Sequence, residues 1–265
     1  MTDKAPMLDP AERSARGAAL QAAINPGLPT AAATPLEGSL RDFIFAEIWN
    51  RPGMDRRSRF LVALAGSVLA AASDTVIDGY AEGALKGGEL TLGELREAAL
   101  HLAVYSGWHR GLALDQAVTR VAARLGLSDS AYPPMRAAPW DPEVRTREGM
   151  AEFAAVMTFS GGPSISPFLE AINNFVFGEM WCRYDGLDQR ARRWITLVGV
   201  CESAAETPIK SHVHAAMASG NCTPAEMQEF VLQYGIHAGW PKASAVQGAV
   251  FEMSRKVAEG LPWNG

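Results

Sequence analysis

The segment FIFAEIWNRPG (residues 43–53) returns later in the chain as FVFGEMWCRYDG (residues 175–186). The Glu-x-Trp shared by the two segments is offset by 132 residues. A period of this length is that of a small domain and is far too long for a solenoid repeat. The repeated segment therefore predicts that a whole domain has been duplicated within the chain.

The correspondence extends outward from this segment in both directions. It holds at acidic, glycine, threonine and tryptophan positions, namely Asp9/Asp141, Gly88/Gly220, Thr91/Thr223, Glu94/Glu226, Gly107/Gly239 and Trp108/Trp240. One extra residue near Tyr184 shifts the offset to 133 for a short stretch, so that Arg59 corresponds to Arg192. We expect an N-terminal repeat over residues 1–132 and a C-terminal repeat over residues 133–265, joined within the Pro-rich stretch 128–141.

Both repeats have the sequence pattern of helices. Asp9-Pro10 and its counterpart Asp141-Pro142 combine an N-cap residue with a first-turn proline. Thr91 and Thr223 are each followed three residues later by glutamate, which is a capping box, and Ser39-x-x-Asp42 resembles one. Period-2 alternation is absent, so the predicted fold class is all-α, with two fused helical bundles related by internal duplication.

Composition and charge limit the classes of function. The chain is 48% hydrophobic and 20% charged, with a net charge of −5, which is ordinary for a globular protein and does not favour a nucleic-acid partner. The three cysteines include no C-x-x-C pair, so we expect neither a disulfide framework nor a dithiol centre, and a cytoplasmic location. The start of the chain lacks a signal-peptide pattern, and the most apolar stretch, residues 60–72, is too short to cross a membrane.

Residues suited to acid–base chemistry gather in the second repeat. Glu206, His212, His214 and His237 fall within 32 residues. The corresponding residues of the first repeat are Asp74, Tyr80, Glu82 and Tyr105. Two histidines that are two positions apart on a helix project roughly 200° from one another. We therefore expect His212 to point inward and His214 to be exposed or to lie at an interface.

A metal site built from His212, His237 and Glu206 is conceivable, but no H-x-x-x-H or H-E-x-x-H pattern is present. We expect neither a metal nor an organic cofactor. His212 could equally be a hydrogen-bonded core residue, and Glu206 could be a simple helix cap.

Glu47 and Glu179 occur inside very apolar segments, where a charge is costly unless it is paired. Arg59 and Arg192, at the start of the next helix, are the expected partners. The alternative role for Arg192 is to bind a substrate carboxylate in a bidentate manner. Trp240 follows a glycine and either packs at a helix–helix turn or forms part of the wall of a substrate site.

Taken together, these segments resemble the carboxymuconolactone decarboxylase family, which also contains alkylhydroperoxidase-D-like proteins. The first repeat supplies Glu47-Ile-Trp-Asn-Arg-Pro-Gly-Met, Arg57-Ser-Arg-Phe-Leu, Ala84-Leu-Lys-Gly-Gly and Tyr105-Ser-Gly-Trp. The second supplies Glu179-Met-Trp-Cys-Arg, Arg190-Ala-Arg, Glu206-x-x-Ile-x-x-His212, Ala216-Met-Ala-Ser-Gly, Thr223-Pro-Ala-Glu and Gly239-Trp-Pro. The resemblance implies a helical bundle and an assembly in which three tandem chains form a pseudo-hexamer.

Departures from the family pattern are informative. Tyr80 stands where the family has histidine, Gln233 stands where it often has histidine, and His237 stands where it has tyrosine. The positions of the peroxidase C-x-x-C are occupied by residues 205–208, which contain no cysteine, so thiol peroxidase chemistry is not expected.

The resemblance implies a cofactor-free lyase that decarboxylates, or moves a proton on, a small unsaturated lactone or keto acid. We expect His212 to donate the proton, with Glu206 orienting it and His237 facing the developing oxyanion. Arg192, Glu179, Trp181 and Trp240 are the expected substrate-binding residues. The alternatives are a dehydratase, isomerase or cyclase that uses the same chemistry, and a non-catalytic ligand-binding or assembly protein. No nucleic acid or membrane partner is expected.

Overall fold

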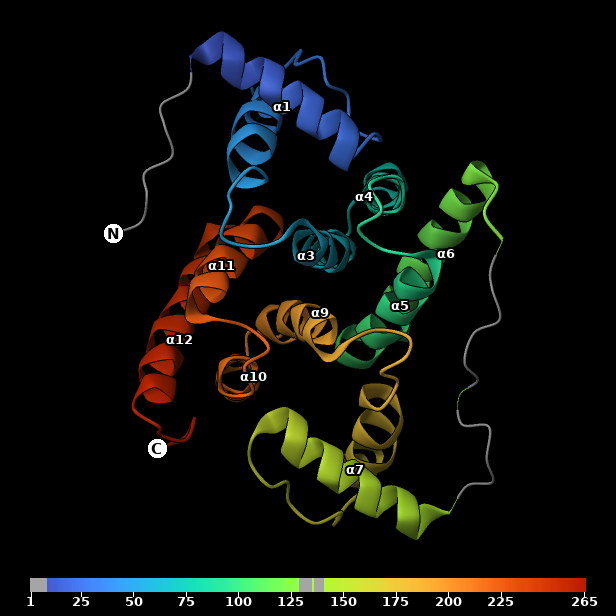
Figure 1. The fold of residues 1–265 in the computed structure, drawn as a ribbon, viewed down its shortest axis with the longest axis vertical. Helices are drawn as coiled ribbons and strands as arrows, with labels where there is room; N and C mark the ends of the chain where they lie inside the picture. Colours follow the sequence, from blue (N-terminus) through green and yellow to red (C-terminus); the bar gives the residue numbers. More distant parts are fainter. Residues whose placement is uncertain (1–8, 129–134, 136–140) are drawn as a thin grey trace.

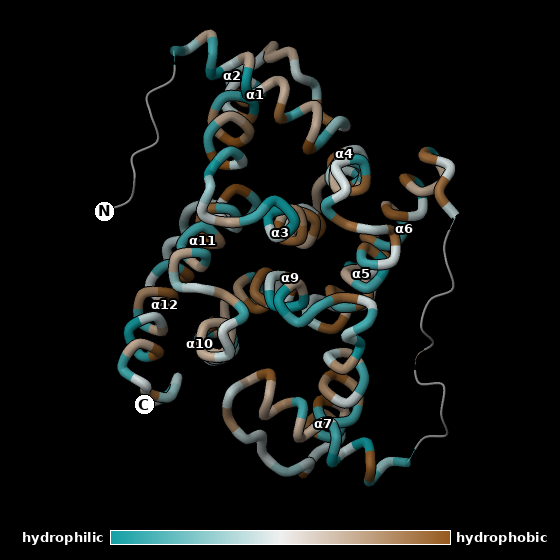
Figure 2. Tube along the Cα trace, viewed as in Figure 1, coloured by the Kyte–Doolittle hydropathy of each residue, from teal (hydrophilic) through white to brown (hydrophobic). Residues whose placement is uncertain are grey.

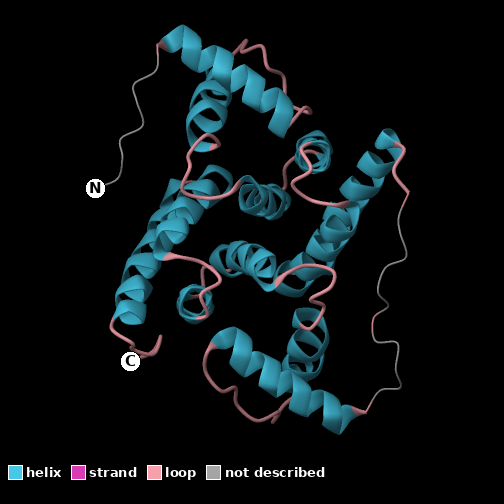
Figure 3. Ribbon diagram, in the orientation of Figure 1, coloured by secondary structure: helices cyan, strands magenta, loops and turns pink. Residues whose placement is uncertain are grey.

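The computed structural model describes residues 9–128, 135 and 141–265, and these contain helices and loops but no strand (Figure 3). Most of the linker expected between the repeats lies outside the described residues. None of the helices in the described ranges combines the length and the apolar character needed to cross a bilayer.

Each repeat contributes seven helical elements in the same order. The first repeat contains α1 (Pro10–Ile24), α2 (Pro35–Ser39), the π-helix η1 (Leu40–Ile48), α3 (Arg56–Leu69), α4 (Asp74–Lys86), α5 (Leu92–Ser106) and α6 (Trp108–Leu125). The second contains α7 (Pro142–Met157), α8 (Pro167–Ala171), the π-helix η2 (Ile172–Trp181), α9 (Gln189–Glu202), α10 (Glu206–Ala218), α11 (Pro224–Ala238) and α12 (Trp240–Ala258). The structure thus confirms the all-α fold and the duplicated order of elements.

The helix starts follow the sequence signals at most positions. The side chains of Asp9 and Asp141 cap α1 and α7, and Thr91 and Thr223 form complete capping boxes with the glutamate three residues later. The capping box suggested at Ser39 is wrong. Thr34 caps this segment instead, because it accepts from the Glu37 backbone N–H while the Glu37 carboxylate accepts from the Thr34 backbone N–H.

The two repeats interlock around a central pair of helices. α3 and α9 lie side by side, α11 of the second repeat packs on α3, and α5 of the first repeat packs on α9 (Figure 1). The hydrophobic segments of α3 and α9 occupy the middle of the molecule (Figure 2). One continuous apolar core contains residues from both repeats. Gly107 connects α5 to α6 and Gly239 connects α11 to α12, with positive φ values of 96° and 88°.

Ion pairs also connect the repeats, which overturns one expectation from the sequence. Arg192 is fully buried and pairs with Glu97 of α5 at 3.1 Å, and the equivalent Arg59 pairs with Glu229 of α11 at 2.9 Å. The predicted pairs Glu47–Arg59 and Glu179–Arg192 are absent. The reason is that Arg59 of α3 and Arg192 of α9 face the opposite repeat.

Glu47 and Glu179 are paired with the first helix of their own repeat instead. Arg13 of α1 lies 2.6 Å from Glu47, and Arg145 of α7 lies 2.6 Å from Glu179. The two glutamates therefore fix α1 on η1 and α7 on η2.

Candidate functional site

Two pseudo-equivalent groups of polar and aromatic side chains lie where the repeats interlock. The group that we call the polar site combines residues of α5 with residues of η2, α9 and α10, namely His101, Tyr105, Trp181, Arg193, Thr196 and His212. The group that we call the second site combines residues of α11 with the residue that follows η1 and with residues of α3 and α4, namely Gln233, His237, Trp49, Phe60 and Tyr80. Each group therefore needs both repeats.

Tyr105 is positioned in the polar site by two hydrogen-bond partners. The Trp181 indole N–H donates to its hydroxyl oxygen at 2.8 Å, and the Thr196 hydroxyl also hydrogen-bonds it. Gly199 on α9 allows this approach, because a Cβ there would lie 3.0 Å from Tyr105 Cβ. Burial raises the pKa of Tyr105 to about 12, so the phenol stays protonated. Because the indole N–H can only donate, the Tyr105 oxygen accepts from it, and the O–H hydrogen is left for Thr196 or a ligand.

His101 connects this arrangement to the ion pair between the repeats. Its Nδ1 is 3.4 Å from Nη1 of Arg192, and its Nε2 is 2.9 Å from Oγ1 of Thr196. Because a guanidinium can only donate, Nδ1 accepts and the proton resides on Nε2, which donates to Thr196. Burial, followed by the charges of Arg192 and Arg193, holds the pKa of His101 well below its usual value. His101 is thus a neutral link that orients Thr196 and, through it, Tyr105.

Most of the N–H groups of Arg192 are used by contacts within the protein. It donates to the backbone carbonyl oxygens of Leu187 and Arg183 at 3.1 and 2.7 Å, and it pairs with the buried Glu97. Burial alone would raise the pKa of Glu97, but Arg183 and Arg192 hold it below its usual range. The sequence-based alternative in which Arg192 binds a substrate carboxylate therefore does not fit its contacts.

Arg193, the next residue, has the properties that Arg192 lacks. It is fully buried, it lies over the Trp181 ring at 5.1 Å, and its Nε donates to Oδ1 of Asn221 at 3.0 Å. Its Nη2 donates to the Val156 carbonyl oxygen, while Nη1 is buried without a partner among the described residues. Burial lowers the pKa of Arg193 to about 10, which leaves it charged at neutral pH. A buried guanidinium with an unpaired nitrogen and no carboxylate partner in the described ranges has the chemistry to bind an anionic group.

His212 lies beside these groups on α10. Its ring is perpendicular to that of Tyr105, with centroids 5.5 Å apart, and its Nδ1 is buried without a partner among the described residues. Burial and then the charge of Arg193 lower the pKa of His212 to about 3. The imidazole is therefore neutral at pH 7, and its side chain is partly exposed.

Two of the other predicted site residues are not near His212. Glu206 is exposed at the start of α10 and pairs with Lys210 at 2.8 Å, one helical turn along the surface. His237 lies in the second site, 5.9 Å from the Tyr80 ring. The predicted grouping of His212, Glu206 and His237 is wrong, because helices of the two repeats exchange partners and place the two histidines in different sites.

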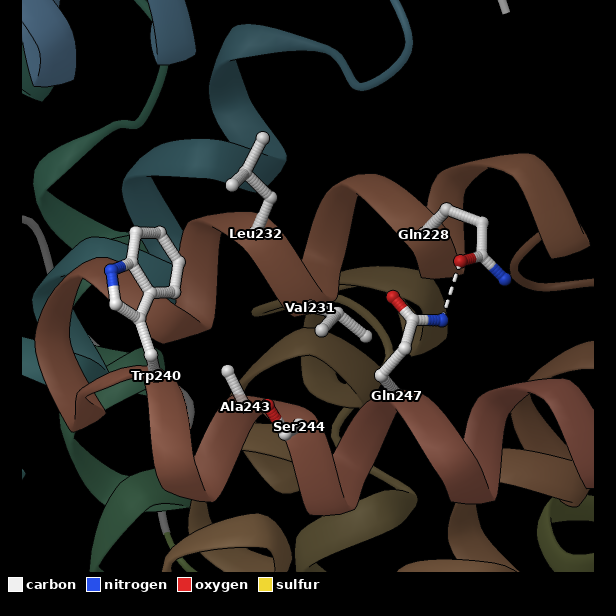
Figure 4. A pocket seen from close by; sticks show the side chains of 7 residues that line it. All are labelled: Gln228, Val231, Leu232, Trp240, Ala243, Ser244 and Gln247. Atoms are coloured by element: carbon white, nitrogen blue, oxygen red, sulfur yellow. Dashed lines mark hydrogen bonds between the residues drawn. The ribbon is translucent and has the colours of Figure 1, made fainter.

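The predicted substrate-binding residues are also separated. Trp181 lies in the polar site, whereas Glu179 forms an ion pair with Arg145. Trp240 is half-exposed and lines an outer groove of about 300 Å³ between α11 and α12 (Figure 4). Gln247 donates to Gln228 across this groove at 2.6 Å.

His214 is buried within the chain, whereas the sequence predicted that it would be exposed or would lie at an interface. Its Nε2 lies 2.9 Å from the backbone carbonyl oxygen of Leu261, so the C-terminal segment covers it. His212 does face inward, toward the other repeat, as predicted.

Sequence reasoning missed His101, Tyr105, Arg193 and Thr196. A signal for Arg193 was present, because the aligned position of the first repeat is Phe60, and a buried helix rarely exchanges phenylalanine for arginine without a reason. No signal placed the α5 residues opposite α9, since that contact depends on how the repeats interlock.

Comparison with known proteins agrees with this architecture. The carboxymuconolactone decarboxylase family matches the chain twice, over residues 36–120 and 166–252. A nitrosuccinic acid decarboxylase of Metarhizium robertsii is 34% identical over 73 residues, which are 28% of this chain and 50% of that protein. The chain thus spans half the length of this curated relative. The two family matches cover more than half of the chain and contain both sites, and the protein therefore belongs to the carboxymuconolactone decarboxylase family.

Proposed function

We propose that the polar site decarboxylates a small carboxylic acid whose leftover electron pair can be delocalised onto oxygen, as in an oxo acid, an unsaturated lactone acid or a nitro acid. The observation that carries this proposal is the buried Arg193 with its unpaired Nη1, next to Tyr105 and His212. The family and the name of the relative favour decarboxylation over other proton-transfer reactions.

The charge movement in such a reaction explains where Arg193 contributes. Loss of CO2 moves negative charge from the departing carboxylate to the enolate or nitronate oxygens. A cation at those oxygens stabilises the transition state more than the ground state, whereas a cation at the departing carboxylate does the reverse. We therefore assign Arg193 and the Tyr105 hydroxyl to the developing oxyanion, the role that the sequence suggested for His237.

His212 is our proposed proton donor to carbon. In the free protein its pKa is lowered by burial and by Arg193. Negative charge that forms beside Arg193 offsets the second of these effects, so His212 becomes more basic as the reaction proceeds. Its partly exposed side chain can take a proton from water and pass it to the carbanion, which balances the loss of CO2.

The test is CO2 release from nitrosuccinate and from oxaloacetate, a simple oxo acid, by the protein and by His212→Ala. We expect turnover to fall about 10²- to 10⁴-fold with little loss of stability. Tyr80→Phe, at the equivalent position of the second site, is the matched control and should keep its turnover. Wild-type turnover in His212→Ala, or equal losses in both variants, would contradict the proposal.

We also propose that the chain self-associates, as the trimer that the family resemblance implies. Large apolar side chains are exposed at equivalent positions of both repeats, with 56% and 52% exposure for Trp108 and Trp240 and 70% and 73% for Leu36 and Phe168. Duplicated exposed apolar residues of this kind are typical of an interface. Sedimentation that shows a monomer at micromolar concentration would exclude this assembly.

A further inference from the structure

We propose that the second site binds a small uncharged molecule through a carbonyl oxygen that accepts hydrogen bonds from Trp49 and Gln233. This binding activity is separate from the reaction proposed for the polar site, and it does not depend on that proposal. The ligand class follows from the donors that have no partner among the described residues, from the apolar walls of the site and from the phenylalanine that stands where the polar site has Arg193.

Two buried donors in this site have no acceptor among the described residues. Trp49 is 3% exposed and Gln233 is fully buried, yet the indole N–H of the first and the amide nitrogen of the second make no hydrogen bond there. Nε2 of His237 is also buried and unpaired within the described ranges. Leaving a buried polar group unsatisfied costs about 1–3 kcal/mol, so a site with three such atoms favours a molecule that supplies partners.

The polar site shows why the tryptophan donor is unpaired here. Trp181 donates to the hydroxyl of Tyr105, but the residue equivalent to Tyr105 is His237. An imidazole is shorter than a phenol and does not extend to the indole N–H as the hydroxyl does. The Tyr80 hydroxyl is hydrogen-bonded by Asn25 and does not take its place.

The remaining contacts define the chemistry of the ligand. Arg59 donates to Oε1 of Gln233 at 3.1 Å, which fixes the amide and leaves its NH2 group as a donor. Arg59 pairs with Glu229 at 2.9 Å, and Glu229 also pairs with Arg51 at 2.6 Å. The position of the polar site's Arg193 is occupied by Phe60, whose ring lies 5.1 Å from that of Trp49. A compact carbonyl compound with an apolar body matches these donors and aromatic walls, and Phe60 removes the guanidinium that an anion would meet at this position of the polar site.

The experiment measures the indole N–H resonance of Trp49 by ¹⁵N NMR during titration with cyclopentanone, with cyclopentanecarboxylate as the anionic probe. Trp49→Phe assigns the resonance by its disappearance. We expect the ketone to shift the Trp49 resonance saturably and the carboxylate to leave it in place. An unmoved resonance at high ketone concentration, which water as the only partner would give, overturns the proposal, as does an equal shift with the carboxylate.

Two variants test the assignment of the donors. His237→Tyr copies the polar site and should give Trp49 an internal acceptor, which weakens ketone binding at least tenfold. Gln233→Met removes the second donor and should also weaken binding about tenfold, while His109→Tyr on the exposed start of α6 should leave it unchanged. Retained ketone affinity in Gln233→Met and in folded His237→Tyr would exclude this site. Because no residue of the polar site is altered, such a result leaves the decarboxylase proposal intact.

Discussion

The polar site and the second site occupy equivalent positions in the two repeats, but most of their polar and titratable side chains differ. Both retain a tryptophan at the C-terminal end of the π-helix and a buried arginine–glutamate pair that joins the repeats. They differ at five aligned positions, which are Arg193/Phe60, Thr196/Ala63, His212/Tyr80, Tyr105/His237 and His101/Gln233. The scaffold was thus preserved while the groups that could do chemistry diverged.

A duplicated chain permits this divergence, whereas a homodimer does not. Two identical chains related by a two-fold axis must have two identical sites. Once the copies are fused, each site can change alone, provided that the contacts holding the repeats together remain. The comparison therefore separates two kinds of residue. Glu97 and Glu229 are equivalent residues that hold the repeats together at each site, whereas Arg193 occurs in one site and has no equivalent in the other.

The largest effect should come from making the polar site like the second site at its cation. In Arg193→Phe we expect kcat/KM for decarboxylation to fall about 10³-fold, which corresponds to about 4 kcal/mol of transition-state stabilisation. The reason is that no other guanidinium in the site is free of a carboxylate. Phe60→Leu is the matched control, and steady-state kinetics should show nearly unchanged turnover. Activity that survives in Arg193→Phe would place the anion receptor elsewhere.

Loss of either buried ion pair between the repeats should reduce the stability of the fold by a similar amount. Glu97→Gln leaves the fully buried Arg192 without its carboxylate, and Glu229→Gln does the same to Arg59, which is 1% exposed. Because an unpaired buried charge is costly, each substitution should reduce the free energy of unfolding by about 3 kcal/mol. Urea denaturation of both variants measures this. A loss of stability in only one of the two variants would show that the two ion pairs do not contribute equally to the fold, although their contacts are equivalent.

The sequence was sufficient for the fold because the relevant signals are local. Asp9, Thr91 and Thr223 cap helices through residues three or fewer positions away, and the 132-residue offset repeats the whole order of helices. Relationships within one repeat, such as the inward direction of His212, could be predicted in the same way.

The site could be predicted only in part, because it is formed between the repeats. Trp181 and His212 were identified, but their partners Tyr105 and His101 come from the other repeat. His237 was grouped with His212 by proximity in sequence, although α10 and α11 face opposite sites. Packing of helices from one repeat against helices of the other does not change the spacing of residues within either repeat, so the sequence pattern could not reveal it.

Removal of the Tyr105 hydroxyl should have a smaller effect than removal of Arg193. Tyr105→Phe deletes one neutral donor to the developing oxyanion, so we expect kcat to fall about 30-fold, or about 2 kcal/mol. His237→Phe, at the equivalent position, should leave turnover unchanged. Stopped assays of CO2 release at saturating substrate compare the two. If His237→Phe were the more damaging variant, catalysis would have to be assigned to the second site.

The smallest expected effect is on stability in acid, and both histidines should contribute to it. The pKa of His237 is lowered to about 4 by burial and that of His212 to about 3 by burial and Arg193, whereas an unfolded histidine titrates near about 6.5. The unfolded chain therefore binds more protons below pH 6.5, so this stability is fully present above that pH and is lost as the pH falls toward the folded values.

His237→Gln and His212→Gln should each reduce the acid-side slope of unfolding free energy by about 1 kcal/mol per pH unit between pH 6 and pH 4. Urea titrations across this range measure the slopes, with Tyr80→Phe as a neighbouring substitution that removes no group titrating there. An unchanged slope in His237→Gln would mean that this imidazole is already protonated in the folded protein, and the second site would then carry a positive charge, as the polar site does through Arg193.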